Sequence, residues 1–117
     1  MKLSATFSAA EKVSTDVIII SLFENTKKIP SELNALNKAS GGAISSLLKN
    51  GDFAGKLNET TIIPTDKTIT PKRVLLVGLG KSADFSFDKV RQAAGTATRV
   101  IQRKKFKNPS ILLYRLE

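Results

Sequence analysis

The sequence contains no cysteine and no histidine. Without cysteine the chain can form neither disulfides nor thiolate metal sites. Without histidine it also lacks the commonest general base and the imidazole ligands of metal centres. The 10 acidic residues do not compensate, because they are scattered along the chain and show no paired spacing typical of acid–base or metal chemistry. We therefore predict no catalytic residue and no metal ligand in this chain.

Long apolar runs are also absent. No segment approaches the roughly 20 consecutive apolar residues that a membrane-spanning helix needs. The N-terminal residues lack the apolar region of a secretory signal. Because the lack of cysteine also fits a reducing compartment, we expect a cytoplasmic protein with no membrane partner.

Acidic residues are few, since 19 lysines and arginines stand against 10 aspartates and glutamates, for a net charge of +9. This surplus favours an anionic partner such as DNA. The alternatives are a soluble basic surface, or a segment of a longer chain whose remainder is acidic. The nucleic-acid candidates cluster near the end of a predicted helix, without an aromatic stacking platform: Arg99, Arg103, Lys104, Lys105 and Lys107.

The strongest structural signal lies at residues 72–81, where four consecutive apolar residues run into Gly78 and Gly80. An unbroken apolar run of this kind is typical of a strand buried on both faces. A helical pattern over residues 87–105 follows, and then an apolar stretch at residues 110–116. This order predicts a strand–helix–strand unit with a parallel strand pair, and hence an α/β fold.

The remaining segments complete the predicted fold. Alternation over residues 1–9 indicates an edge strand with one solvated face. Further strands are predicted at residues 15–23 and 59–63, and short helices at residues 31–38 and 43–49. The second of these helices should end in a left-handed cap at Asn50-Gly51.

The long helix should begin at an N-cap, Ser86, with Asp88 in its first turn. Gly95 is unfavourable in a helix interior, and we interpret it as allowing close approach to a strand. The apolar stripe expected to face the sheet consists of Phe87, Val90, Ala94, Ala97 and Ile101.

Two glycine motifs are candidate phosphate-binding loops. The run from Gly78 to Ala83 fits the dinucleotide pattern G-x-G-x-x-A, although a loop separates it from the helix and the acidic Glu117 lies too far along. Gly41 and Gly42 precede a helix whose free amides could hold phosphate. The alternatives are a tight turn at Gly78 and Gly80, and a break between helices at Gly41 and Gly42.

Several segments occur in a specific order over nearly the whole chain. They are Ala39-Ser40-Gly41-Gly42-Ala43, Gly51-Asp52-Phe53-Ala54-Gly55-Lys56, residues 72–81 and Val90-Arg91-Gln92-Ala93-Ala94-Gly95. Their combination resembles the N-terminal domain of the leucyl aminopeptidase (cytosol aminopeptidase) family. The resemblance implies a macro-domain-like α/β fold with three layers, in which a mixed sheet is flanked by helices.

The resemblance also implies a parent enzyme with a C-terminal metallopeptidase domain, which is absent from this chain. That domain would hold two divalent metal ions, manganese or zinc, and would remove N-terminal residues from peptides. Residues 1–117 would be a single non-catalytic domain, serving assembly of a hexamer and access to the active site. We expect the chain to be a fragment whose last strand is left with an unpaired edge.

Two alternative functions stay open. Some bacterial relatives bind DNA, which the basic cluster could do. Macro domains bind ADP-ribose, and residues 40–44 resemble their glycine-rich loop. However, Ser21-Leu22-Phe23-Glu24-Asn25 stands where macro domains carry an Asn-Ala-Ala-Asn-like stretch. An ADP-ribose or nucleotide site is therefore the less supported of these two alternatives.

Overall fold

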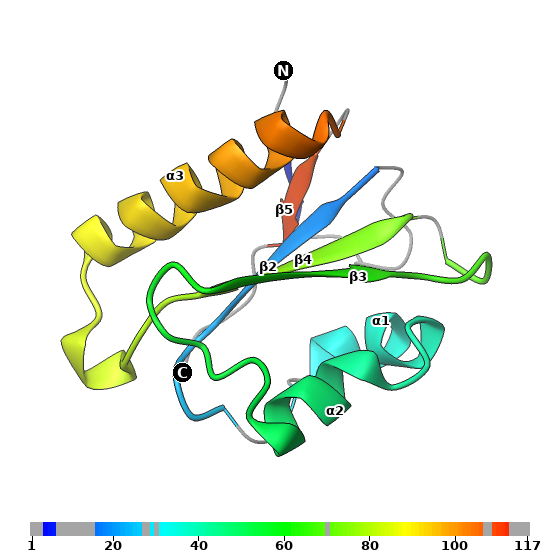
Figure 1. Ribbon diagram of the computed structural model, residues 1–117, viewed down its shortest axis with the longest axis horizontal. Helices are drawn as coiled ribbons and strands as arrows, with labels where there is room; N and C mark the ends of the chain where they lie inside the picture. The colour runs from blue at the N-terminus through cyan, green and yellow to red at the C-terminus, as the bar shows by residue number, and fades with distance from the viewer. Residues whose placement is uncertain are drawn as a thin grey trace.

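One mixed sheet forms the centre of the protein, with helices on both of its faces (Figure 1). The computed structural model describes residues 4–6, 16–26, 29, 31–69, 71–106 and 109–112. The strand order is β1-β5-β2-β4-β3. The strands are β1 (Ser4–Thr6), β2 (Ile18–Leu22), β3 (Thr60–Pro64), β4 (Arg73–Gly78) and β5 (Ser110–Leu112). All neighbours are parallel except β3, which runs antiparallel to β4 at one edge.

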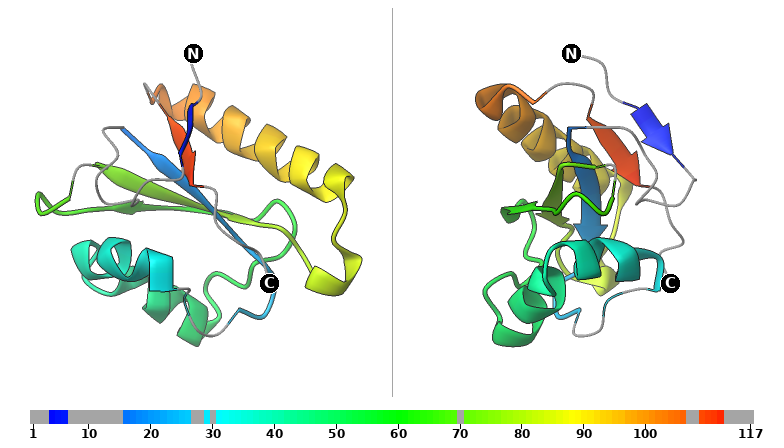
Figure 2. Two further views of the ribbon diagram at one scale, coloured as in Figure 1. Left: turned by 180° about the vertical axis from the view of Figure 1, so that it is seen from behind. Right: turned by 90° about the vertical axis from the view of Figure 1, so that its right-hand side faces the viewer.

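The helices form the two outer layers, as the side view in Figure 2 shows. Helix α3 (Phe87–Lys104) covers one face of the sheet. The other face is covered by a 3-10 turn at Ser31–Leu33, by α1 (Asn34–Ala39) and by α2 (Ala43–Asn50). The expected three-layer architecture is therefore confirmed. No helix among the described residues is long and apolar enough to cross a membrane.

Strands β2 and β4 are buried on both faces, as their apolar runs predict. Ile18, Ile20 and Leu22 pack toward α1 and α2, whereas Val17 and Ile19 pack toward α3. Successive side chains of a strand point to opposite faces, so one apolar run supplies two separate cores. Each core then holds its own helical layer against the sheet.

The position of β5 corrects the expectation of an unpaired last strand. β5 lies between β1 and β2 and pairs in parallel with both. It is also not the neighbour of β4, because β2 separates them. The predicted strand–helix–strand unit is therefore right in direction but wrong in adjacency, because β4 and β5 are each parallel to β2, which lies between them. Of the two predicted terminal strands, residues 1–3, 7–9 and 113–116 lie outside the described residues.

Helix α3 begins as predicted, because the Ser86 hydroxyl accepts a hydrogen bond from the Lys89 amide at 3.3 Å and Asp88 lies in the first turn. The left-handed cap of α2 is also confirmed, at Gly51 with a φ of 79°. The predicted apolar stripe is right for two of its five members. Its members Ala97 and Ile101 are buried, but Ala94 is exposed, and Phe87 and Val90 are 92% and 39% exposed.

The exposure of Phe87 and Val90 has a geometric cause. Figures 1 and 2 show that the first turns of α3 extend beyond the ends of the strands. Apolar spacing along a helix indicates which side faces the core, but it does not indicate where the sheet underneath ends. Ala93 and Val100 fill the buried face of α3 instead.

Candidate functional site

The carboxyl ends of β2 and β4 lie side by side, where open α/β sheets commonly bind ligands. Here backbone hydrogen bonds connect the two segments that leave these strands. The Leu79 amide donates to the Leu22 carbonyl at 2.9 Å, and the Glu24 amide donates to the Gly80 carbonyl at 2.8 Å. The loop after α2 joins them, because the Asn25 amide donates to the Ala54 carbonyl at 3.1 Å.

Gly78 and Gly80 belong to this network. The Gly78 amide donates to the Glu59 carbonyl at 2.8 Å, and the Gly80 amide donates to the Gly55 carbonyl at 2.9 Å. A Cβ on Gly78 would lie 2.0 Å from the Lys56 carbonyl oxygen. Both amides that the dinucleotide pattern would offer to a phosphate therefore already bond to protein carbonyls. This arrangement supports the tight turn that we gave as the alternative.

The backbone amides of residues 54–56 point at one acceptor, the side chain of Glu59, which the sequence did not single out. The Glu59 carboxylate accepts hydrogen bonds from three consecutive amides, those of Ala54, Gly55 and Lys56, at 3.0, 2.9 and 3.1 Å. Successive amides of this kind form a nest that binds anions. Glu59 thus acts as an internal anion, and no local sequence signal distinguishes it from the other scattered carboxylates.

Removing this carboxylate should destabilise the fold. We expect Glu59→Ala to lower the free energy of unfolding by about 2 kcal/mol, because three amides lose a charged acceptor. Glu59→Gln, which keeps one acceptor oxygen, should lose less. Thermal unfolding followed by circular dichroism measures both. Asp52→Ala, at an exposed carboxylate of the same loop, is the control, and an equal effect there would contradict the role of Glu59.

Gly41 and Gly42 adopt left-handed conformations, with φ of 72° and 80°. The Gly41 amide donates to the Lys38 carbonyl at 3.1 Å, and the Gly42 amide donates to the Asn37 carbonyl at 2.8 Å. The Asn37 side chain also accepts from the Ser45 amide at 3.0 Å. These bonds match a glycine break between α1 and α2. Binding of ADP-ribose or another nucleotide at this loop stays a prediction.

The predicted nucleic-acid residues lie at the C-terminal half of α3. Arg99, Arg103, Lys104 and Lys105 are all exposed. Lys105 ends the helix in a left-handed conformation with a φ of 60°. Lys107 lies outside the described residues. We call the four described residues the basic cluster.

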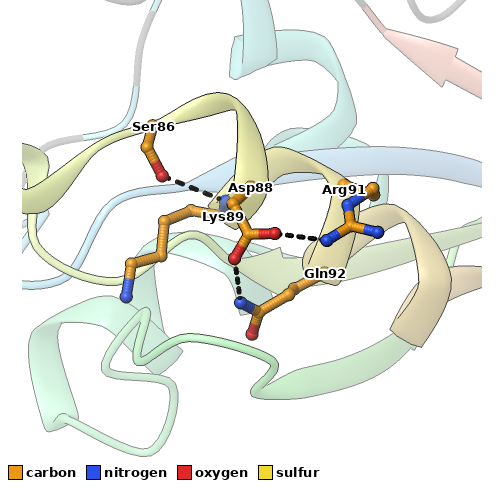
Figure 3. Close-up of polar contacts among 5 residues, drawn as sticks. All are labelled: Ser86, Asp88, Lys89, Arg91 and Gln92. Atoms are coloured by element: carbon orange, nitrogen blue, oxygen red, sulfur yellow. Dashed lines mark hydrogen bonds and ion pairs between the residues drawn. The ribbon is translucent and has the colours of Figure 1, made fainter.

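The first turns of α3 carry a polar cluster (Figure 3). The Asp88 carboxylate accepts from the Arg91 guanidinium and from the Gln92 side-chain amide, the latter at 2.7 Å. The hydrogen bond from Arg91, followed by that from Gln92, holds the pKa of Asp88 below its ordinary value. The same ion pair raises the pKa of Arg91. Both groups therefore stay charged across the neutral range.

An open groove of about 290 Å³ separates this cluster from the turn before β3. Its lining residues are Asn58, Arg91, Gln92, Gly95 and Arg99. The Thr96 hydroxyl donates to the Asn58 side-chain oxygen at 2.8 Å, which ties the turn to the helix. Sequence reasoning missed this groove because Asn58 and Thr96 are 38 residues apart.

We next consider whether the described residues could bind a metal ion. Among the described residues, no group of three or more acidic, histidine or cysteine side chains lies close enough to hold a metal ion. The described part of the chain also has no buried side-chain nitrogen or oxygen without a hydrogen-bond partner.

Comparison with known proteins adds the family context. Residues 19–117 match the model of the cytosol aminopeptidase family, N-terminal domain. A probable cytosol aminopeptidase of Dechloromonas aromatica is 35% identical over 117 residues, which are 99% of this chain and 23% of that protein. The chain spans about a fifth to a quarter of the length of the curated relatives it matches.

Solved structures show the same fold. A tomato leucine aminopeptidase variant is similar with a TM-score of 0.72 at 20% identity, over 98% of this chain and 23% of that one. The macrodomain of Mycobacterium tuberculosis DarG has a TM-score of 0.68 at 10% identity, over 94% of this chain and 74% of that one. The expected macro-domain-like architecture is therefore confirmed.

Proposed function

The chain belongs to the cytosol aminopeptidase family, as its N-terminal domain, and from this premise we propose that it is a non-catalytic domain that docks onto a metallopeptidase domain. In this proposal it serves assembly of a hexamer and access to the active site. The match covers 99 residues of the family model region, 19–117, while the relatives are several times longer than this chain. The chemistry of the parent would accordingly lie in the remaining sequence.

One observation supports docking above the others. Phe85, Phe87 and Val90 are 42%, 92% and 39% exposed at the start of α3. We call these three residues the apolar patch. Phe85 is held in place by an edge-to-face contact with Phe23, at a ring-centroid distance of 5.3 Å. Exposed aromatic side chains that gather at one place commonly mark an interaction surface.

The proposed occupant of the apolar patch is the C-terminal catalytic domain of the parent. Roughly four-fifths of the length of the relatives lies outside the part that this chain matches. In this proposal that part is a large folded domain of the same polypeptide. Two divalent ions, manganese or zinc, would be held in that domain, since the described residues here offer no cluster of ligands. The parent would release N-terminal residues from peptides in the cytoplasm.

The first test measures the size of the native polypeptide. Blotting an extract of the source cell with an antibody to this domain should give a band several hundred residues longer than this chain. That polypeptide should release leucine from leucyl peptides in the presence of manganese or zinc, whereas the 117-residue chain alone should not. A native band at the size of this chain would contradict the proposal.

The apolar patch gives a second test. In the longer polypeptide, Phe87→Lys should reduce the fraction of assembled and active enzyme, because a charge replaces the exposed ring at the docking surface. Phe87→Leu, which stays apolar, should retain assembly. Sedimentation velocity and peptidase activity measure the two effects. Unchanged assembly of the lysine variant would contradict docking through the patch, and self-association of the isolated chain through Phe87 would assign the patch to a second copy.

A second candidate function, DNA binding, is favoured by the exposed basic cluster. We expect the logarithm of the affinity to fall with the logarithm of the salt concentration, by about 0.9 for each phosphate neutralised. Arg103→Gln with Lys104→Gln should reduce this slope by about 2. The charge-matched control, Lys38→Gln with Lys49→Gln on α1 and α2, should not change it. Affinity that is independent of salt would exclude DNA binding.

A further inference from the structure

We propose that the groove between α3 and the turn before β3 is a binding site for a single oxyanion group, a phosphate or a carboxylate, held over Gly95 by Arg99 and Asn58. The groove volume of about 290 Å³ is close to the lower limit for small-ligand pockets. This site is independent of the docking proposal, because the apolar patch and the groove share no residue.

Gly95 gives the first argument. It lies in the interior of an 18-residue helix, where glycine costs about 1 kcal/mol relative to alanine. The sequence suggests close packing against a strand as the reason, but the structure contradicts it. A Cβ at this position would meet only the Arg99 Nη1 atom, at 3.6 Å. The missing side chain therefore lets the Arg99 guanidinium lie close over the helix backbone at Gly95, which forms the floor of the groove, and it makes no close contact with the sheet.

A chain of hydrogen bonds orients the donors around this floor. The Arg99 Nη2 atom donates to the Thr96 hydroxyl at 3.0 Å, and that hydroxyl donates to the Asn58 Oδ1 atom. Asn58 thereby has its oxygen engaged, so its amide nitrogen is the group left to donate. Arg99 keeps further N–H groups of its planar fork for a ligand. Both residues line the groove, which is where the proposal places their remaining donors.

The opposite end of the groove limits the charge of the ligand. Arg91 lies eight residues before Arg99, or about 12 Å along the helix axis, with Gly95 midway between them. Its guanidinium pairs with Asp88, as Figure 3 shows. Two guanidiniums and one carboxylate leave a net charge of about +1 around the groove. This balance suits one oxyanion group better than a polyanion.

The chemistry of the lining excludes other ligand classes. The side chains around the groove are two arginines, an asparagine and a glutamine, with no apolar side chain among the lining residues. An apolar ligand would find only the carbon stems of polar side chains and the Gly95 backbone, and a cation would meet two positive charges. Arginine forks bind phosphate and carboxylate through paired N–H groups, which is the recognition that this geometry offers.

The test is a titration of the 117-residue chain with inorganic phosphate at constant ionic strength, followed by ¹H–¹⁵N NMR. We expect saturable shifts of the Gln92, Gly95 and Arg99 amides and of the Asn58 side-chain amide, with a dissociation constant on the order of 1 mM. Arg99→Gln should weaken binding roughly tenfold or more. The same titration is repeated with acetate. Tighter binding of acetate would indicate a carboxylate ligand, and tighter binding of phosphate would indicate a phosphate ligand.

Two variants distinguish specific binding in the groove from non-specific attraction of phosphate to a positively charged protein. Gly95→Leu should abolish binding without changing the net charge, because a side chain fills the floor of the groove. Lys49→Gln removes one positive charge on α2, on the far side of the sheet, and should leave binding unchanged. Shifts that do not saturate, or equal weakening by Lys49→Gln and Arg99→Gln, would overturn the proposal.

Discussion

A Gly78→Ala variant should unfold at least 10 °C below the unmodified chain, at a loss of about 3 kcal/mol or more. The added Cβ would lie 2.0 Å from the Lys56 carbonyl oxygen and 2.6 Å from the Gly55 carbonyl carbon. These neighbours are backbone atoms, so no side-chain rotation relieves the overlap. Separating the segments would break the bonds from the Gly78 amide to Glu59 and from the Asn58 amide to the Gly78 carbonyl.

The matched control is the same substitution at Gly95, where the expected sign is opposite. Gly95→Ala should raise the free energy of unfolding by up to about 1 kcal/mol, because alanine favours a helix and meets only the Arg99 side chain. Differential scanning calorimetry of the two variants measures the contrast. A Gly78→Ala variant as stable as the unmodified chain would show that the loop at residues 54–59 moves aside freely.

The second large effect concerns Phe53, which is 1% exposed in the core between the sheet and helices α1 and α2. Phe53→Ala should lower the free energy of unfolding by about 3–5 kcal/mol, because it removes a whole ring and leaves a cavity. The residue lies in the irregular segment just after α2, where its amide donates to the Leu47 carbonyl at 3.2 Å. Its ring therefore fixes that loop against the core.

Phe87→Ala is the control for this comparison, since the same side chain is removed from a position that is 92% exposed. Its stability should change by less than about 0.5 kcal/mol. Urea unfolding of both variants, with the slope compared, distinguishes a lost contact from a changed unfolded state. Similar losses for the two variants would contradict the assignment of Phe53 to the core.

The buried parts of the fold were predictable because their signals are local. The apolar run at residues 74–77 needs cover on both faces, and the structure provides α3 on one side and α1 with α2 on the other. Ser86 can cap a helix because its hydroxyl accepts a hydrogen bond from a backbone amide, and Gly51 can end one because glycine readily adopts a left-handed conformation. The order of segments also sufficed for the family, which residues 19–117 match.

Features that depend on distant partners could not be predicted in this way. Phe87 follows the helical apolar pattern and is exposed, because the pattern contains no information on the length of the sheet. Glu59 resembles any surface carboxylate until the loop folds around it. The groove forms only because Thr96 contacts Asn58, which is distant in sequence. The position of β5 depends on its pairing with β1 and β2, which also come from distant parts of the chain.

The place of β5 also governs the order in which the protein can fold during synthesis. β1 precedes the other described strands, yet within the described sheet its neighbour is β5, which lies 106 residues further along the chain, since Ser4 pairs with Ser110. Within the described sheet, β1 therefore stays unpaired until residues 110–112 have left the ribosome. Pairings this distant in sequence slow folding, and an open strand edge invites contacts with other chains. Nascent chains truncated before residue 110 would thus be the species most in need of a chaperone.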